Sequence, residues 1–224
     1  MTNDAINTDM DKNMTENQQP EPVKKPDDVG GMFIRGHIKI FDPETKEVFV
    51  DKPNAIHYEN MSEALAYCLA DFSGNFIKTM NFGNGGTSVD PTGVINYLPA
   101  NTNNQNAGLY NQTFSKNVDG NSSENLDPAN NKMEIRHIPG KIYTDILVTC
   151  LLDYGEPAGQ ASFDNTQNLN DKYVFDELGL FSSRDPQRML THVVFHPVQK
   201  SLNRKIQIDY TVRIQALTNL SSIG

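Results

Sequence analysis

The chain has 224 residues, 37% of them hydrophobic, and a formal net charge of -9 at pH 7. This length and apolar content suffice for one domain of ordinary size with a tail or long loops left over. The acidic balance, with no Lys/Arg run longer than a pair such as Arg204-Lys205, argues against a nucleic-acid partner, and no apolar run approaches the ~20 residues that span a bilayer. We therefore expect neither nucleic acid nor a membrane as a partner.

The two cysteines, Cys68 and Cys150, are too few for a disulfide framework, and both have apolar neighbours. The sequence therefore predicts two buried free thiols. The first residues lack the apolar region of a signal peptide. Together these features predict a soluble protein made in a reducing cytoplasm.

Residues 1–30 are rich in Asn, Asp, Gln, Glu, Lys and Pro and hold few large apolar side chains. Such a segment cannot bury enough surface to offset the entropy of ordering. We expect a disordered or extended N-terminal arm, which in an assembly could be held against a neighbouring subunit.

The folded part is predicted to begin at Gly31 with a hairpin. One strand runs through Ile38 and Ile40, and a second strand runs through Val48 and Val50. Pro43, in the turn at 42–46, presets the backbone of the first central turn position.

A single helix is predicted after the hairpin, in the N-terminal third. Apolar residues recur at spacings of three and four between Ala64 and Phe72, Asn60 or Ser62 is a suitable N-cap, and Gly74 ends the helix. Because the helix is apolar around most of its girth, we expect it to be buried.

A short strand over 76–82 leads into the glycine-rich loop at 83–87. Glycine can bring backbone N–H groups close to a phosphate, but this loop has no Gly-Lys-Ser/Thr ending and no helix pattern after it. We expect a structural turn instead, with Gly83, Gly85 or Gly86 at positive φ.

The middle of the chain alternates polar loops with strands. Residues 99–131 form a long polar excursion with one short strand between 109 and 118, and a loop of this length is typical of a partner contact. The β-branched run 142–152 predicts a central strand buried on both faces, and 155–170 is a second polar loop.

Three consecutive strands, at 173–180, 189–195 and 206–215, are predicted to close the fold as an antiparallel meander. The last alternates strictly between apolar and polar residues, which indicates one buried face. The fold class predicted is mainly β: an antiparallel β-sandwich with one buried α-helix and long polar loops, a single domain over 31–218, and a short C-terminal tail at 219–224.

Candidate catalytic and metal-binding groups do not form a site. His192 and His196 lie on a predicted strand, about 13 Å apart at ordinary strand rise, as half-buried side chains on one side. Asp176 and Glu177 are adjacent and point to opposite faces, and no serine lies in a Gly-x-Ser-x-Gly elbow. We therefore predict no catalytic, cofactor-binding or metal-binding residues, and a protein that is not an enzyme.

Four short motifs follow one another along the chain. They are Asn-Ala-Ile-His-Tyr-Glu-Asn at 54–60, the glycine-rich segment at 80–87, Glu-Leu-Gly-Leu-Phe at 177–181, and the stretch at 190–201 that ends in Pro-Val-Gln-Lys-Ser. In this order they resemble a group of tailed-bacteriophage virion structural proteins, namely tail-fibre and baseplate attachment domains and neck or capsid-surface components. The resemblance covers about 31–216.

The resemblance implies a non-enzymatic adaptor, collar or tail-associated subunit of a virion, made in the host bacterial cytoplasm, that forms homo-oligomers and binds other virion structural proteins. No cofactor is expected. The chain stops soon after the β domain without the repetitive shaft of a fibre. A capsid decoration protein and a carbohydrate-binding β-sandwich, whose loop Asn, Asp and Tyr residues would hold sugars, are the alternatives.

Overall fold

The computed structural model describes residues 31–160, 162, 168–169 and 171–217. The predicted arm at 1–30, the tail at 219–224 and much of the end of the loop at 155–170 lie outside the described residues. The elements in chain order are β1 (Gly31–Phe41), β2 (Val48–Ile56), α1 (Tyr58–Leu69), β3 (Ile77–Gly83), β4 (Thr87–Val89), β5 (Ile95–Tyr97), β6 (Gln112–Asn117), β7 (Lys132–His137), β8 (Tyr143–Leu152), β9 (Val174–Ser182), β10 (Thr191–Gln199) and β11 (Ile206–Leu217).

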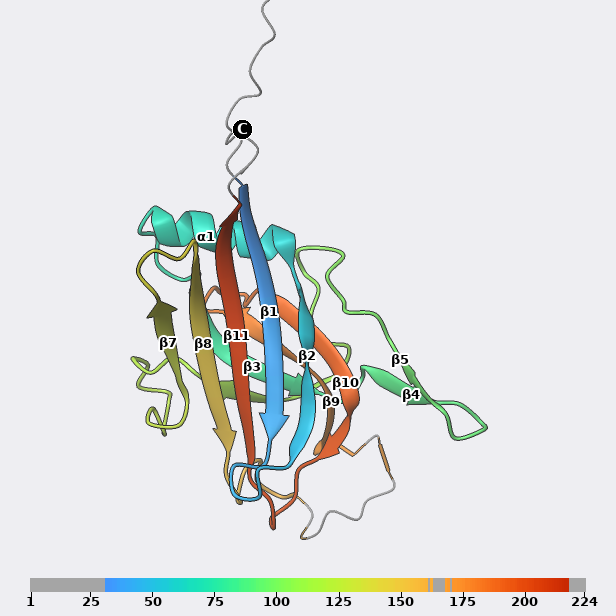
Figure 1. Ribbon diagram of the computed structural model, residues 1–224. Helices are drawn as coiled ribbons and strands as arrows, with labels where there is room; N and C mark the ends of the chain where they lie inside the picture. Colours follow the sequence, from blue (N-terminus) through green and yellow to red (C-terminus); the bar gives the residue numbers. More distant parts are fainter. Residues whose placement is uncertain (1–30, 161, 163–167, 170, 218–224) are drawn as a thin grey trace, which may run out of the picture.

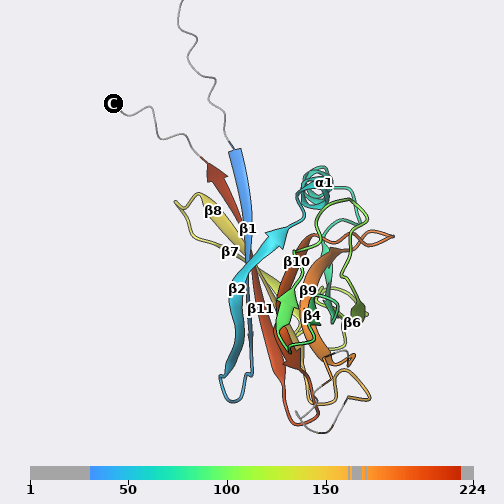
Figure 2. The same cartoon turned by 90° about the vertical axis from the view of Figure 1, so that its right-hand side faces the viewer.

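The main architecture is one antiparallel sheet of nine strands in the order β6-β3-β9-β10-β2-β1-β11-β8-β7, with β4 and β5 as a separate hairpin. The sheet folds back on itself at β2. Residues 48–54 of this strand pair with β1, and Ala55 and Ile56 pair with β10. The two halves therefore face each other as layers, with β7, β8, β11 and β1 in front of β3, β9 and β10 (Figures 1 and 2). The predicted mainly β, sandwich-like class is confirmed.

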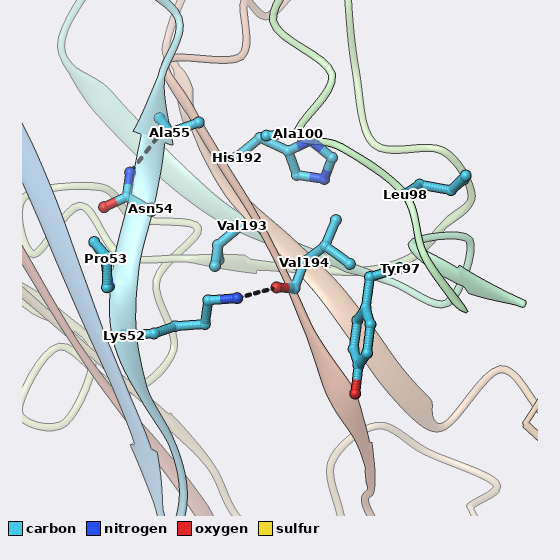
Figure 3. A pocket seen from close by; sticks show the side chains of 10 residues that line it. All are labelled: Lys52, Pro53, Asn54, Ala55, Tyr97, Leu98, Ala100, His192, Val193 and Val194. Atoms are coloured by element: carbon cyan, nitrogen blue, oxygen red, sulfur yellow. Dashed lines mark hydrogen bonds between the residues drawn. The ribbon is translucent and has the colours of Figure 1, made fainter. Parts of the chain in front are cut away.

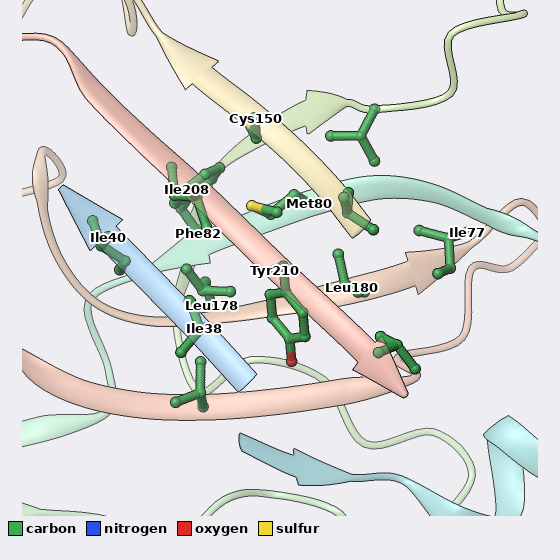
Figure 4. Close-up of a cluster of buried hydrophobic side chains, with 14 of the residues drawn as sticks. Ile38, Ile40, Ile77, Met80, Phe82, Cys150, Leu178, Leu180, Ile208 and Tyr210 are labelled. Atoms are coloured by element: carbon green, nitrogen blue, oxygen red, sulfur yellow. The ribbon is translucent and has the colours of Figure 1, made fainter. Parts of the chain in front are cut away.

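The core lies between the two layers (Figure 4). On β11, Ile206, Ile208, Tyr210 and Val212 are all buried, while the residues between them are partly exposed. Burial of an aliphatic side chain such as that of Ile208 contributes about 1.5–3 kcal/mol, and these residues belong to a core to which both layers contribute. The predicted one-faced terminal strand is confirmed for these four residues, whereas Ile214, expected on the same buried face, is only partly buried.

The predicted hairpin, the strand at 76–82 and the short strand within 109–118 are also confirmed, as β1–β2, β3 and β6. The hairpin turn is held by Asp42, whose carboxylate accepts the backbone N–H groups of Glu44 at 2.7 Å and Thr45 at 3.1 Å. The sequence placed proline in this turn for its fixed φ, and the structure adds the aspartate that organises it.

Two strand predictions were wrong. The last three strands do not form a meander, because β11 pairs with β1 and β8, while β10 pairs with β9 and β2. The strand β8 is not buried on both faces: only Val148, Cys150 and Leu152 are fully buried, since its other face forms part of the outer surface of the front layer.

The helix also departs from its prediction. Only Asn60, Met61 and Ala64 of α1 are buried, and Leu69 is 87% exposed. The helix lies across one end of the layers, as Figure 1 shows, so a single narrow stripe meets the core. Cys68 is therefore exposed and only Cys150 is the buried thiol that the sequence predicted.

The N-cap of α1 is His57, not Asn60 or Ser62. The His57 Nδ1 accepts the backbone N–H of Asn60 at 3.3 Å, and the His57 backbone N–H donates to Leu190 O at 2.9 Å. The Asn60 amide instead donates to Met189 O at 2.9 Å and Gln105 O at 3.1 Å. The first turn of the helix is thus tied to the approach to β10 and to the long polar loop.

Candidate interaction surface

A buried carboxylate, Glu177 on β9, organises the loops at one face of the back layer. Its oxygens accept the backbone N–H groups of Asn111 at 2.8 Å and Tyr110 at 2.9 Å, and His192 Nε2 lies 3.0 Å away. The Asn101 N–H donates to His192 Nδ1 at 2.8 Å, so Nε2 carries the ring proton and donates it to Glu177. The loop that begins at residue 99 is pinned at two points to the sheet.

The pKa directions of the two adjacent carboxyl groups differ. Desolvation acts to raise the pKa of Glu177, but the hydrogen bonds from His192, Asn111 and Tyr110 outweigh it and hold the pKa below its usual value. Desolvation raises the pKa of Asp176, and its hydrogen bonds only partly offset this effect. Each carboxylate has its own set of donors, so the structure does not bring them together as an acid and base pair.

The glycine-rich loop is closed over these carboxylates. The Asp176 carboxylate accepts the backbone N–H groups of Gly86 at 2.9 Å and Thr87 at 2.8 Å, and Glu177 accepts that of Gly85 at 3.1 Å. The N–H groups that a phosphate would need at these positions are therefore bonded within the protein, which favours the predicted structural role.

The physical reason for the glycines is close approach, and the expectation of positive φ was wrong. None of Gly83, Gly85 and Gly86 is among the glycines with positive φ. A Cβ at Gly83 would lie 2.5 Å from Asn111 O, and one at Gly85 would lie 2.7 Å from Asn111 N. The loop thus packs backbone against backbone, as glycine alone permits.

The two candidate histidines of the strand differ in burial and in their partners. Both belong to β10, but His192 is fully buried against Glu177, while His196 is exposed and its Nδ1 lies 3.1 Å from Tyr97 Oη. A shift of register between 194 and 198 interrupts the regular strand. The expectation of two half-buried histidines on one side was therefore wrong, and they do not share a ligand.

A small pocket of about 190 Å³ lies between β2, β10 and the loop after β5 (Figure 3). Tyr97 forms one wall, and Lys52 reaches across the floor to donate to Val194 O at 2.9 Å. The Asn54 amide donates to Ala55 O at 2.9 Å. An exposed aromatic ring beside polar groups is suited to a sugar, although both side-chain donors already have partners in the protein.

The larger surface feature is an apolar groove along α1, which we call the α1 groove. Its first part has a volume of about 480 Å³ and is lined by Met32, Phe33 and Ile34 of β1 and by Tyr58, Met61 and Leu65 of α1. Its second part has a volume of about 400 Å³, and its lining includes Met61, Leu65, Cys68, Ile135, Ile146 and Ile214. The two parts share Met61 and Leu65, so they adjoin along the helix.

The α1 groove exists because the front layer extends beyond the back layer. Ile34, Ile146 and Ile214 continue the inward-facing rows of β1, β8 and β11, but only part of each is covered. At the edge, Ile135 on β7 is 68% exposed. A contiguous patch of exposed apolar side chains, unlike a single exposed residue, is typical of a contact site.

The sequence patterns predict buried positions for Ile146 and Ile214 and give no indication of an apolar surface here. The sequence feature that indicates such a groove is the helix α1, which is apolar around most of its girth. A helix of this kind at the end of a sandwich has more apolar surface than the core can cover. Among the described residues no group of three or more His, Cys, Asp and Glu could hold a metal ion.

In the part of the chain that the structure describes, no helix has the length and apolar character to cross a membrane. Comparisons with protein-family models, with curated proteins and with solved structures find no match to this chain.

Proposed function

We propose that this chain is a non-enzymatic structural subunit of a tailed-bacteriophage virion, an adaptor, collar or tail-associated protein that assembles with copies of itself and with other virion proteins. The observation that carries the proposal is the α1 groove, an open apolar surface at one end of a β-sandwich. The virion assignment rests on the motif resemblance described above.

The chemistry of the rest of the molecule agrees with an assembly role. The buried groups that could do acid and base chemistry, Asp176, Glu177 and His192, are engaged in holding loops to the sheet. The sheet ends at β6 and β7, each paired on one side, and β7 carries alternating charges at Lys132, Glu134 and Arg136. Charged edge strands resist indiscriminate pairing, which leaves the groove as the more selective contact.

Self-association across the micromolar range, measured by sedimentation velocity, tests this proposal. Ile135→Glu places a charge at the open edge of the groove and should weaken association by about tenfold or more, because an apolar contact is lost and the new carboxylate loses water in the complex. The melting temperature should be almost unchanged because the side chain is already mostly exposed. Leu126→Glu is the matched control, since Leu126 is 94% exposed but lies outside the groove.

A wild-type chain that remains monomeric over this range and binds no other protein of the particle would overturn the proposal. Equal effects of Ile135→Glu and Leu126→Glu on association would show that the α1 groove is not the contact surface. A cryo-EM map of the source particle with this chain traced would place the subunit, and would separate the tail or collar role from the alternative of capsid decoration.

The second candidate function is carbohydrate binding, favoured by the pocket beside Tyr97. Tyr97 is 52% exposed and offers a ring face of the kind on which sugars stack. Titration of the chain with a panel of oligosaccharides, followed by Tyr97→Ala, tests this role. Saturable binding that Tyr97→Ala abolishes, in a chain that stays monomeric, would favour it over assembly.

A further inference from the structure

The α1 groove has a definite shape and chemistry. It runs beside a helix of 12 residues, which is about 18 Å long at 1.5 Å per residue, and its walls come from β1 on one side and β7, β8 and β11 on the other. Such a groove between a helix and a sheet accepts another amphipathic helix, whose apolar side chains enter at intervals of three or four residues.

A segment of this chain has the matching pattern. Between residues 1 and 14, Ile6, Met10 and Met14 recur at intervals of four, while the residues between them are mainly Asn, Asp, Thr and Lys. In a helix these three side chains would lie within one narrow stripe, on a length of about 21 Å for 14 residues. Methionine is flexible and polarisable, which suits a groove of irregular depth.

The length of the segment after residue 14 determines whether the stripe meets the groove of its own chain or that of a neighbouring chain. Residues 15–30 contain Pro20, Pro22 and Pro26, and a Pro-rich spacer is extended and semi-rigid at about 3.1 Å per residue. Sixteen residues then span about 50 Å, compared with about 36 Å for the 11 residues of β1. Since the spacer joins β1 next to Met32, an extended spacer carries the stripe past the groove of its own chain.

We propose that residues 1–14 of one copy lie as an amphipathic helix in the α1 groove of a neighbouring copy, with Ile6, Met10 and Met14 facing the groove. This inference rests on the proposed self-assembly and names the segment that carries it. The apolar stripe replaces water over Ile135, Ile146 and Ile214, and the exchange of arms links subunits without requiring contact between their sheets.

Cys68 provides a direct test, because it is exposed and lines the groove. The other thiol, Cys150, is fully buried, and desolvation raises its pKa to about 12, so it is unreactive at neutral pH. A chain with Met10→Cys and Cys68→Ser is mixed with an affinity-tagged chain of the natural sequence and exposed to a mild oxidant. A disulfide between the two then joins the arm of one copy to the groove of the other.

The matched control is Lys12→Cys with Cys68→Ser. It places a thiol on the same arm, two residues away and about 200° around the helix from Met10. The expected result is a mixed disulfide dimer that forms at least tenfold faster with Met10→Cys than with Lys12→Cys, and that Ile135→Glu in the tagged chain suppresses. Rates are followed by non-reducing gel electrophoresis and the linked residues by peptide mass spectrometry.

Equal rates for the two positions would overturn the proposal, because a loosely tethered arm has no preferred face. A disulfide formed mainly within one chain, in a variant that keeps Cys68 and carries Met10→Cys, would overturn exchange between copies. If the natural chain self-associates in sedimentation but Met10→Cys gives no preferential disulfide, this inference alone fails. A monomeric chain would remove the proposed function as well.

Discussion

At the scale of single residues, the buried carboxylate of Glu177 connects three segments of the chain through its hydrogen bonds. Moving a carboxylate out of water costs several kcal/mol, and only good hydrogen bonds compensate for it. Here the compensation comes from backbone N–H groups of Gly85, Tyr110 and Asn111 and from His192. One side chain on β9 therefore holds the glycine-rich loop, the long polar loop and β10 together.

Glu177→Gln should destabilise the fold by about 2–4 kcal/mol, measured by urea unfolding at neutral pH. Glutamine keeps the shape but offers one acceptor oxygen, and its amide N–H₂ would face donors that it cannot satisfy. The control is Glu124→Gln, a change of the same chemistry at an exposed ion pair in which Glu124 lies 2.8 Å from Lys78. That variant should unfold almost as the natural chain does, since exposed pairs contribute little.

The same substitution should change the pH dependence of stability. The folded-state pKa of Glu177 lies below the ordinary value of 4.5, so its ionised form stabilises the fold above that pH. This contribution is lost as the pH falls through the folded pKa. Unfolding free energies at a series of pH values should therefore decline less steeply below pH 4.5 in Glu177→Gln. A decline as steep as that of the natural chain would contradict this account.

The sequence singles out Asp176, Glu177, His192 and the glycine-rich loop separately, and its patterns predict neither a catalytic nor a phosphate-binding role for them. It did not bring them together, because Gly85 and Glu177 are 92 residues apart and their contact depends on the pairing of β3 with β9. The close approach of the backbone to Asn111, which accounts for Gly83 and Gly85, leaves no local trace in the sequence.

At the scale of elements, periodicity carries most of the information. The terminal strand β11 keeps one apolar row over its buried residues, and Ile208 has no exposed surface, whereas Asp209 is partly exposed and accepts a hydrogen bond from Gln207 at 2.9 Å. Neighbouring residues of this strand thus face different environments, one the core and the next the water. Strand period therefore fixes which substitutions the fold tolerates.

Ile208→Asp should prevent folding, because an unpaired carboxylate in the core costs several kcal/mol against a total stability of roughly 5–15 kcal/mol. Asp209→Ile, one residue along, should fold with a melting temperature close to that of the natural chain. Circular dichroism and thermal melting of the two variants distinguish them. Equal damage from both would mean that β11 does not have one buried face.

The elements that were predicted from the sequence are those with a clear period or turn signal, such as β11, the β1–β2 hairpin and β3. Their neighbours were not predictable from the same signals. β11 pairs with β1, the first strand of the described chain, and with β8, and neither pairing leaves a mark in the alternation of β11. The mistaken meander arose because adjacency in sequence was taken as adjacency in the sheet.

At the scale of the whole molecule, the sheet turns over at β2 and leaves the front layer longer than the back layer at one end. The helix α1 covers only part of that end, and the groove beside it remains open. The first strand begins there, since Gly31 pairs with Leu217. The arm at 1–30 is therefore attached to the domain next to the open α1 groove.

Deletion of residues 1–30 should leave the domain folded and abolish its self-association. The strand pairings of β1 that the structure describes run from Gly31 onward, and the buried core lies within the described domain, so we expect the domain to fold without the arm. The melting temperature should stay within a few degrees when both chains are compared at a concentration where they are monomeric, because association itself raises apparent stability. Sedimentation velocity then measures the lost association. A large drop in melting temperature would show that the arm belongs to the folded core. Undiminished association of the shortened chain would mean that the groove is covered by a second domain directly, without an exchanged arm.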